Sequence, residues 1–136
     1  LGGGLPIGAT MLSEKLQDIL TPGSHGSTFG GNPVCCAGAL NILSRIDDAL
    51  LAEVREKSAY IFSELRGKPG VRSVTGLGLM IGIEPERDAL EVIARCRANG
   101  VLPIKAKNKV RLLPPLNIPW PLLKQAVAVI AEACAP

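Results

Sequence analysis

Residues 23–33 combine the side chains and backbone freedom that a small-ligand site needs. Ser27 and Thr28 offer hydroxyl donors, and the four glycines of this stretch let the backbone approach another molecule closely. Asn32 followed by Pro33 is typical of a helix start, with an N-cap residue and then proline in the first turn. Because the N-terminus of a helix attracts negative charge, we interpret the stretch as an anion-binding loop. The alternative is a flexible Gly/Ser linker.

Arg111 is the second candidate for ligand chemistry. It stands in the apolar run Val-Arg-Leu-Leu at residues 110–113, directly before two prolines. A guanidinium in an apolar strand needs an anionic partner, because burying it unpaired is costly, and its two-pronged shape matches a carboxylate. We therefore expect Arg111 to receive a carboxylate. The alternative is an edge strand from which Arg111 points into water.

The remaining reactive side chains form no catalytic or metal-binding pattern. His25 is the only histidine, and its spacing suggests no dyad, so we expect a local hydrogen bond for it. The four cysteines lack the spacing of a zinc or redox site. We expect all four to be buried, unreactive thiols in a reduced cytoplasmic protein, and these four are Cys35, Cys36, Cys96 and Cys134.

Apolar side chains at three- and four-residue steps predict the helices that must position these residues. A helical turn is expected at residues 13–20, and longer helices after Pro33, from Asp48 to a stop at Gly67, from an Asp88 cap to residues 99–100, and from about Pro121 to Cys134. The expected buried face of the helix after Pro33 consists of Val34, Ala37, Leu40, Leu43 and Ile46.

Branched apolar residues between glycines and prolines predict the strands. These are expected at residues 7–12, 71–75, 79–84, 101–104 and 109–113. The order of helices and strands indicates an α+β fold of α/β layers, in which a short antiparallel or mixed sheet is covered by helices on one side. The first thirty residues have the pattern of an extended arm with little core of its own.

Length and composition fit one globular domain. The chain has 136 residues, of which 47% are hydrophobic and 20% charged. The net charge is only +3, the basic residues are scattered among 12 acids, and there are four aromatic residues. This composition argues against nucleic acid as a partner. No apolar run approaches the length of about 20 residues that a membrane span requires.

Three motifs together resemble those of the class III, fold-type I aminotransferases, most closely the acetylornithine aminotransferase members of that family. They are Leu-Gly-Gly-Gly-Leu-Pro-Ile-Gly-Ala at residues 1–9, His-Gly-Ser-Thr-Phe-Gly-Gly-Asn-Pro at 25–33 and Val-Arg-Leu-Leu-Pro-Pro-Leu at 110–116. In the family, the lysine that forms the Schiff base with pyridoxal 5'-phosphate stands two residues before the position of Leu1. The resemblance therefore implies a C-terminal part without the catalytic lysine, inactive by itself.

The resemblance also implies an arrangement of domains and subunits. Residues 1–33 correspond to the tail of the cofactor-binding large domain, and residues 34–136 to a connecting helix and the small C-terminal domain. Thr28 matches a threonine that reaches the cofactor phosphate of the other subunit, and Ser27 its neighbour that touches substrate across the same interface. Arg111 matches an arginine that can receive a substrate carboxylate or pair with a family glutamate. A homodimer with a shared site and no metal is implied.

The implied reaction is transfer of the terminal amino group of N-acetylornithine to 2-oxoglutarate, a step of arginine biosynthesis. Within the family, the alternatives are ornithine, succinylornithine and 4-aminobutyrate aminotransferases and the related aminomutase. The alternative from a different class is a stand-alone folding or dimerisation module without chemistry.

Overall fold

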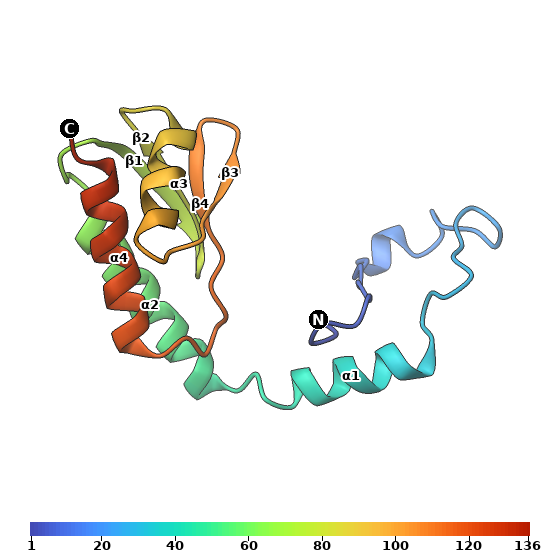
Figure 1. The fold of residues 1–136 in the computed structure, drawn as a ribbon. Coiled ribbons are helices and arrows are strands. Elements are labelled where there is room, and N and C mark those ends of the chain that lie inside the picture. The colour runs from blue at the N-terminus through green and yellow to red at the C-terminus, as the bar shows by residue number, and fades with distance from the viewer. The chain divides into compact units, whose positions relative to one another are not determined.

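The computed structural model describes residues 1–136 and divides them into two compact units, Leu1–Asp47 and Asp48–Pro136. The first unit contains one short 3-10 helix and α1, and the second contains the other helices and the whole sheet (Figure 1). The domain boundary expected after residue 33 stays a prediction.

The first unit is irregular up to residue 32, apart from the 3-10 helix η1 (Glu14–Leu16). This helix falls within the helical turn expected at residues 13–20. Residues 7–12 are irregular, so the strand expected there is wrong. Extended backbone needs a hydrogen-bonding partner strand, and the bridge that this unit forms joins Gly2 and Leu5 within one tight turn.

Helix α1 (Pro33–Leu43) begins where the sequence predicts. The side chain of Asn32 accepts a hydrogen bond from the backbone N–H of Cys35 at 3.0 Å, which satisfies one of the free donors of the first turn. Pro33 occupies the first helical position, where its missing N–H costs nothing. The helix start is therefore encoded locally, by two adjacent residues.

The buried face predicted for α1 is wrong. Its five predicted members are exposed, and the buried side chains are Cys35 and Ala39. The turn at residues 2–5 decides this, because it packs on the face of α1 that carries Gly38. A methyl group on Gly38 would lie 2.6 Å from Leu5 Cδ1, so the missing side chain is what lets the turn approach. The apolar stripe Val34, Ala37, Leu40, Leu43 and Ile46 has no partner within this unit.

The second unit opens with helix α2 (Asp48–Leu65), followed by the hairpin of β1 (Val71–Leu77) and β2 (Met80–Pro85). Helix α3 (Ala89–Ala98) leads to a second hairpin, β3 (Ile104–Ala106) and β4 (Lys109–Leu112), and α4 (Trp120–Cys134) ends the unit. The sequence predicted each of these elements, although β3 begins only at Ile104, where the expected strand at 101–104 was to end.

The four strands form an antiparallel sheet in the order β1-β2-β4-β3. Helices α2 and α3 contact the sheet, and α4 packs against both helices (Figure 1). Along β2, Ile81 and Ile83 are buried while Gly82 and Glu84 between and after them are half-buried. One face of the sheet is thus covered by helices, and the opposite face is open, which confirms the predicted α+β layers.

One hydrophobic core holds the second unit together. It joins the covered face of the sheet to the apolar stripes of the three helices. Burying each of these side chains contributes about 1.5–3 kcal/mol relative to leaving it in water. Its fully buried members of largest volume include Ile61, Leu65, Ile81, Ile83, Val92, Val110, Val127 and Ile130. None of the α-helices combines the length and the apolar composition needed to span a bilayer.

Candidate functional site

Arg111 lies on the open face of the sheet in the second unit. Its neighbour Val110 is fully buried in the core, and because successive side chains of a strand alternate between faces, Arg111 points to the opposite side. It pairs with Gly82 of β2 on one side and with Ile104 of β3 on the other. Strand β4 is therefore an inner strand, and the alternative that placed Arg111 on an edge strand does not hold.

The guanidinium of Arg111 lacks a partner within the chain. Its side chain is half-buried, its Nε is buried without a hydrogen-bond acceptor, and no carboxylate forms an ion pair with it. Leaving a buried donor unpaired costs about 1–3 kcal/mol. The buried Arg111 Nε thus lowers the stability of the fold, and no residue of this chain accepts its hydrogen bond.

Glu84 stands on β2 two residues after Gly82, the pairing partner of Arg111, but its carboxylate already binds other side chains. Its carboxylate accepts hydrogen bonds from Ser73 Oγ at 3.0 Å and from Asn108 Nδ2 at 2.9 Å. Arg72 Nη1 lies 3.7 Å from the same carboxylate. Because three groups of the chain share this acid, Glu84 does not neutralise Arg111.

Lys57 is an important residue that the sequence analysis did not single out. It is fully buried on α2, and its ammonium donates to the backbone carbonyl of Leu116 at 3.2 Å and contacts Glu53 Oε1 at 2.9 Å. Leu116 lies in the segment that follows β4, so Lys57 restrains the chain just after the strand of Arg111. The available signal was its position on the apolar stripe of α2, three residues after Val54 and four before Ile61.

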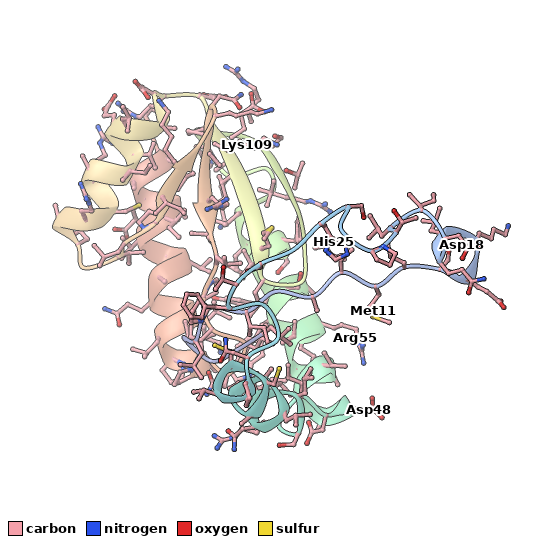
Figure 2. The ribbon with its side chains drawn as sticks, turned by 90° about the vertical axis from the view of Figure 1, so that its right-hand side faces the viewer. Met11, Asp18, His25, Asp48, Arg55 and Lys109 are labelled. Atoms are coloured by element: carbon pink, nitrogen blue, oxygen red, sulfur yellow. The ribbon has the colours of Figure 1, made fainter.

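Ser27 and Thr28 lie in an exposed, irregular loop of the first unit. Their hydroxyls make no hydrogen bond within the chain, while the loop backbone is held by Gly30 N–H donating to Ser27 O at 3.3 Å and by the cap at Asn32. His25, labelled in Figure 2, is also exposed and has no partner in the chain, so the expected local hydrogen bond is not formed. The loop therefore presents its polar side chains outward.

All four cysteines are free thiols. Cys35, Cys96 and Cys134 are buried as predicted, whereas Cys36 is only half-buried, so the burial expected for Cys36 is wrong. Burial raises the pKa of Cys96, and burial together with the neighbouring Cys96 raises the pKa of Cys134 to about 11. Both thiols are protonated at neutral pH and are therefore poor nucleophiles.

A cavity of about 410 Å³ opens at the start of α3, beside the β3–β4 turn. Its walls carry charges of both signs, and none of the predicted site residues lines it. Two of its carboxylates are already used within the chain, Glu84 as described above and Asp88 as the cap that accepts from Leu90 N–H. Its lining includes Arg72, Glu84, Arg87, Asp88, Lys105 and Lys107.

Comparison with known proteins gives a consistent result across sequence and structure. The model of the aminotransferase class-III family matches residues 1–134. The acetylornithine aminotransferase of Haemophilus ducreyi is 44% identical over 134 residues, which cover 97% of this chain and 34% of that protein. The enzyme of the same name from Aquifex aeolicus is 41% identical, over 97% of this chain and 35% of its own length.

Solved structures show the same similarity. The ornithine aminotransferase of Toxoplasma gondii superposes with a TM-score of 0.72 at 32% identity, over 86% of this chain and 30% of that chain. The acetylornithine aminotransferase of Elizabethkingia anophelis gives 0.69 at 31% identity, over 85% and 33%. The chain spans about a third of the length of the relatives it matches. Its fold corresponds to one part of a fold-type I aminotransferase.

Proposed function

Because this chain belongs to the class-III aminotransferase family, we propose that it is the C-terminal part of a pyridoxal-phosphate-dependent aminotransferase. The proposed reaction moves the terminal amino group of N-acetylornithine to 2-oxoglutarate, in arginine biosynthesis. The 44% and 41% identity to two proteins named acetylornithine aminotransferase, each over 97% of this chain, supports this donor. The four free cysteines are consistent with the proposed cytoplasmic location.

The observation that carries the proposal is the unpartnered guanidinium of Arg111. Its Nε is buried without an acceptor, and the neighbouring acid Glu84 is held by Ser73 and Asn108. A carboxylate arriving from outside the chain would satisfy the guanidinium with charge-assisted hydrogen bonds. Amino acids and 2-oxo acids both carry such a carboxylate, so Arg111 is suited to orient the substrate of an amino-group transfer.

The loop before α1 fits the phosphate of the cofactor. The Thr28 hydroxyl is exposed and unused within the chain, and it stands four residues before the cap of a helix whose first turn carries no acidic side chain. Hydroxyl and backbone N–H groups near a helix start are suited to bind a phosphate. When bound, pyridoxal phosphate supplies the electron sink that stabilises the carbanion formed at the substrate carbon. In this proposal, Thr28 binds the phosphate and Ser27 contacts the substrate.

Both hydroxyls are proposed to act on the site of the other subunit in a homodimer. This arrangement is carried over from the family motif at residues 25–33, and the free hydroxyls are consistent with it. In the family motif that residues 1–9 resemble, the lysine that attaches the cofactor stands two residues before the position of Leu1. We therefore propose that the 136-residue chain by itself does not transaminate.

The test of Arg111 uses the full-length enzyme and Arg111→Lys, which keeps the charge but loses the two-pronged geometry. We expect normal folding and a kcat/KM for 2-oxoglutarate lowered about tenfold or more, which corresponds to about 1.4 kcal/mol. The control is Arg72→Lys, an exposed arginine of the same sheet, which should leave the kinetics unchanged. If neither the donor nor the acceptor half-reaction slows in Arg111→Lys, the carboxylate site is elsewhere.

The test of the loop is Thr28→Val in the full-length dimer. Losing a hydrogen bond to a charged group should weaken cofactor binding by about 1–3 kcal/mol, measured by equilibrium dialysis of pyridoxal phosphate. Thr21→Val is the matched control, because its side-chain hydroxyl lies in the same irregular stretch outside the motif. Unchanged cofactor affinity in Thr28→Val would refute the assignment.

The choice of amino donor is tested on the full-length protein by steady-state kinetics. Acetylornithine, ornithine and 4-aminobutyrate are compared at saturating 2-oxoglutarate. We expect the highest kcat/KM for acetylornithine. A higher value for either of the other amines would replace acetylornithine in the proposal while leaving the transaminase assignment in place.

A further inference from the structure

Lys57 connects α2 to the segment that follows the strand of Arg111. Its side chain is fully buried, and its ammonium donates to the backbone carbonyl of Leu116 at 3.2 Å. Burying an ammonium is costly even when it is paired, and an apolar side chain of similar volume would avoid that cost. The hydrogen bond to Leu116 is the contribution that an apolar side chain could not supply.

The carbonyl that this ammonium binds belongs to a tight turn between β4 and α4. Ile118 N–H donates to Pro115 O at 3.0 Å, with Leu116 and Asn117 between them. Pro114 and Pro115 join the turn to the end of β4, and because their rings fix φ, this link is stiff. Figure 1 shows the stretch running from the end of β4 past α2 to the start of α4. A displacement of the turn is therefore passed on to β4.

Arg111 lies close to the end of β4 that this segment leaves. The strand ends at Leu112, and its last pairs with β2 are Gly82 with Arg111 and Ile81 with Leu112. Residues at the end of a strand open more readily than those at its centre, unless the chain beyond them is held. Release of this end into water would also give the buried Nε of Arg111 an acceptor. An anchor beyond Leu112 opposes that release.

Helix α2 holds the turn at one point and the start of α4 at another. The Lys57 ammonium binds Leu116, and the ring of Tyr60 meets that of Trp120 edge-on with centroids 5.8 Å apart. The contact at Leu116 is the one closer to β4 along the chain. Glu53 lies 2.9 Å from the ammonium and balances its charge from a side chain that is 41% exposed. The hydrogen bond from Lys57 is therefore what fixes the turn to α2.

We propose that Lys57 is a positioning residue for carboxylate binding. Its bond to Leu116 anchors the end of β4 and so keeps the guanidinium of Arg111 on the open face of the sheet. Lys57 itself touches neither substrate nor cofactor, because it lies on α2 at the covered face. The proposed role rests on the proposed function of Arg111, and it makes the affinity for the substrate carboxylate depend on a residue of the opposite face.

The first test is steady-state kinetics of the full-length enzyme with Lys57→Met, which removes the ammonium and keeps most of the volume. We expect kcat/KM for 2-oxoglutarate to fall about fivefold or more, through a higher KM at nearly constant kcat. The affinity for pyridoxal phosphate should stay within about twofold, since Thr28 lies in the other unit. The matched control is Ile61→Val, which trims a fully buried side chain of the same helix. It should lower stability and leave KM unchanged.

A double-mutant cycle shows whether Lys57 acts through Arg111. Arg111→Leu removes the guanidinium, so Lys57→Met should add less than about twofold to the loss of kcat/KM in that background. Two losses that multiply instead would indicate a general effect on the fold, and they would overturn the proposed role.

Hydrogen exchange of the full-length enzyme follows the strand end without any substrate. The peptide that covers β4 should exchange about tenfold faster in Lys57→Met, whereas the peptide that covers β1 should be unchanged. Glu53→Gln removes the counter-charge but leaves the bond to Leu116, and it should not change the exchange of β4. Unchanged exchange of β4 in Lys57→Met would refute the anchor.

Pro115→Gly tests the stiff link without touching a buried group, because Pro115 is exposed. It leaves Lys57 and Leu116 in place and frees the backbone between the turn and β4. It should therefore raise KM for 2-oxoglutarate and speed the exchange of β4. This variant decides the matter if Lys57→Met does not fold, and an unchanged KM together with unchanged exchange would overturn the proposed role.

Arg111→Lys separates the role of Lys57 from the proposed function. If Arg111→Lys slows the reaction with 2-oxoglutarate while Lys57→Met and Pro115→Gly do not, the proposed function stands and the role of Lys57 is refuted. If Arg111→Lys leaves the reaction unchanged, the proposed function of Arg111 fails, and the role of Lys57 in carboxylate binding fails with it.

Discussion

The two units of the chain differ in how many of their apolar side chains they bury. The second unit buries a continuous apolar core between its helices and one face of its sheet. Besides Gly2, the first unit buries only Cys35 and Ala39, both in α1, and it leaves large apolar side chains exposed, among them Met11, Phe29, Val34 and Leu40. Both contain well-formed helices with clear caps. The comparison teaches that local signals suffice to start a helix but do not supply the surface on which it packs.

The largest expected effect comes from removing core volume. In the 136-residue chain, Ile61→Ala should lower the free energy of unfolding by about 2–5 kcal/mol, because it leaves a cavity at a fully buried site. Leu40→Ala in the first unit, where the side chain is 68% exposed, should cost less than about 0.5 kcal/mol. Urea unfolding followed by far-UV circular dichroism, which reports the helices of both units, measures both. Equal losses would contradict the contrast between the units.

The buried lysine should give the next largest effect. Lys57→Ala should destabilise the second unit by about 2–3 kcal/mol, because it removes packed methylenes and leaves the Leu116 carbonyl without its donor. Lys57→Met keeps most of the volume and removes a buried charge, so it should cost clearly less than Lys57→Ala. Urea midpoints compare the two variants. Equal losses in the two variants, both of which lack the ammonium, would show that the ammonium matters more than the stem.

The buried thiols predict a pH dependence that belongs to the second unit. The folded state raises the pKa of Cys134 from 9.0 to about 11, so between these pH values it holds a proton that the unfolded chain releases. The contribution of Cys134 to the free energy of unfolding is therefore fully present below pH 9.0. It falls as the pH rises, by about 2 kcal/mol at pH 11. Urea unfolding from pH 8 to 11 should show a steeper decline for the parent chain than for Cys134→Ala.

The smallest expected effect is at the β3–β4 turn. Lys107 adopts a positive φ of 57°, a conformation that disfavours any side chain with a Cβ atom. Lys107→Gly should raise the free energy of unfolding by about 0.5 kcal/mol, since the relief of strain exceeds the added freedom of the unfolded chain. Lys105→Gly, within β3, should lower it by about 0.5–1 kcal/mol. Opposite signs in thermal unfolding would support this account of the turn.

The sequence predicted the helices and strands of the second unit and the first residues of helices α1 and α3. Asn32 and Asp88 each accept a hydrogen bond from the first turn of their helix, as their positions indicated. These signals act over two to four residues, so they are visible in the chain itself. The α+β class could also be predicted, because the sequence shows the order of segments with helical periodicity and segments with strand periodicity.

The sequence also singled out the residues proposed to bind ligand, but not their surroundings. Arg111 was conspicuous because a charge within an apolar run demands an explanation. Whether its strand is inner or at the edge depends on the pairing of β4 with both β2 and β3, which are segments separated along the chain. The roles of Ser27 and Thr28 came from the family motif, and they stay predictions.

Only the tertiary structure decided which face of each element is buried and which distant residues meet. The turn at Gly2 and Leu5 selected the face of α1 that carries Gly38, against the apolar stripe that the sequence favoured. The strand expected at residues 7–12 did not form because no partner strand lies within its unit. Lys57 and Leu116 meet across 59 positions, and Lys109 reaches Thr75 across 34. Such contacts depend on strand register and helix packing, which are set by the whole core at once, whereas caps and periodicity are set by neighbours along the chain.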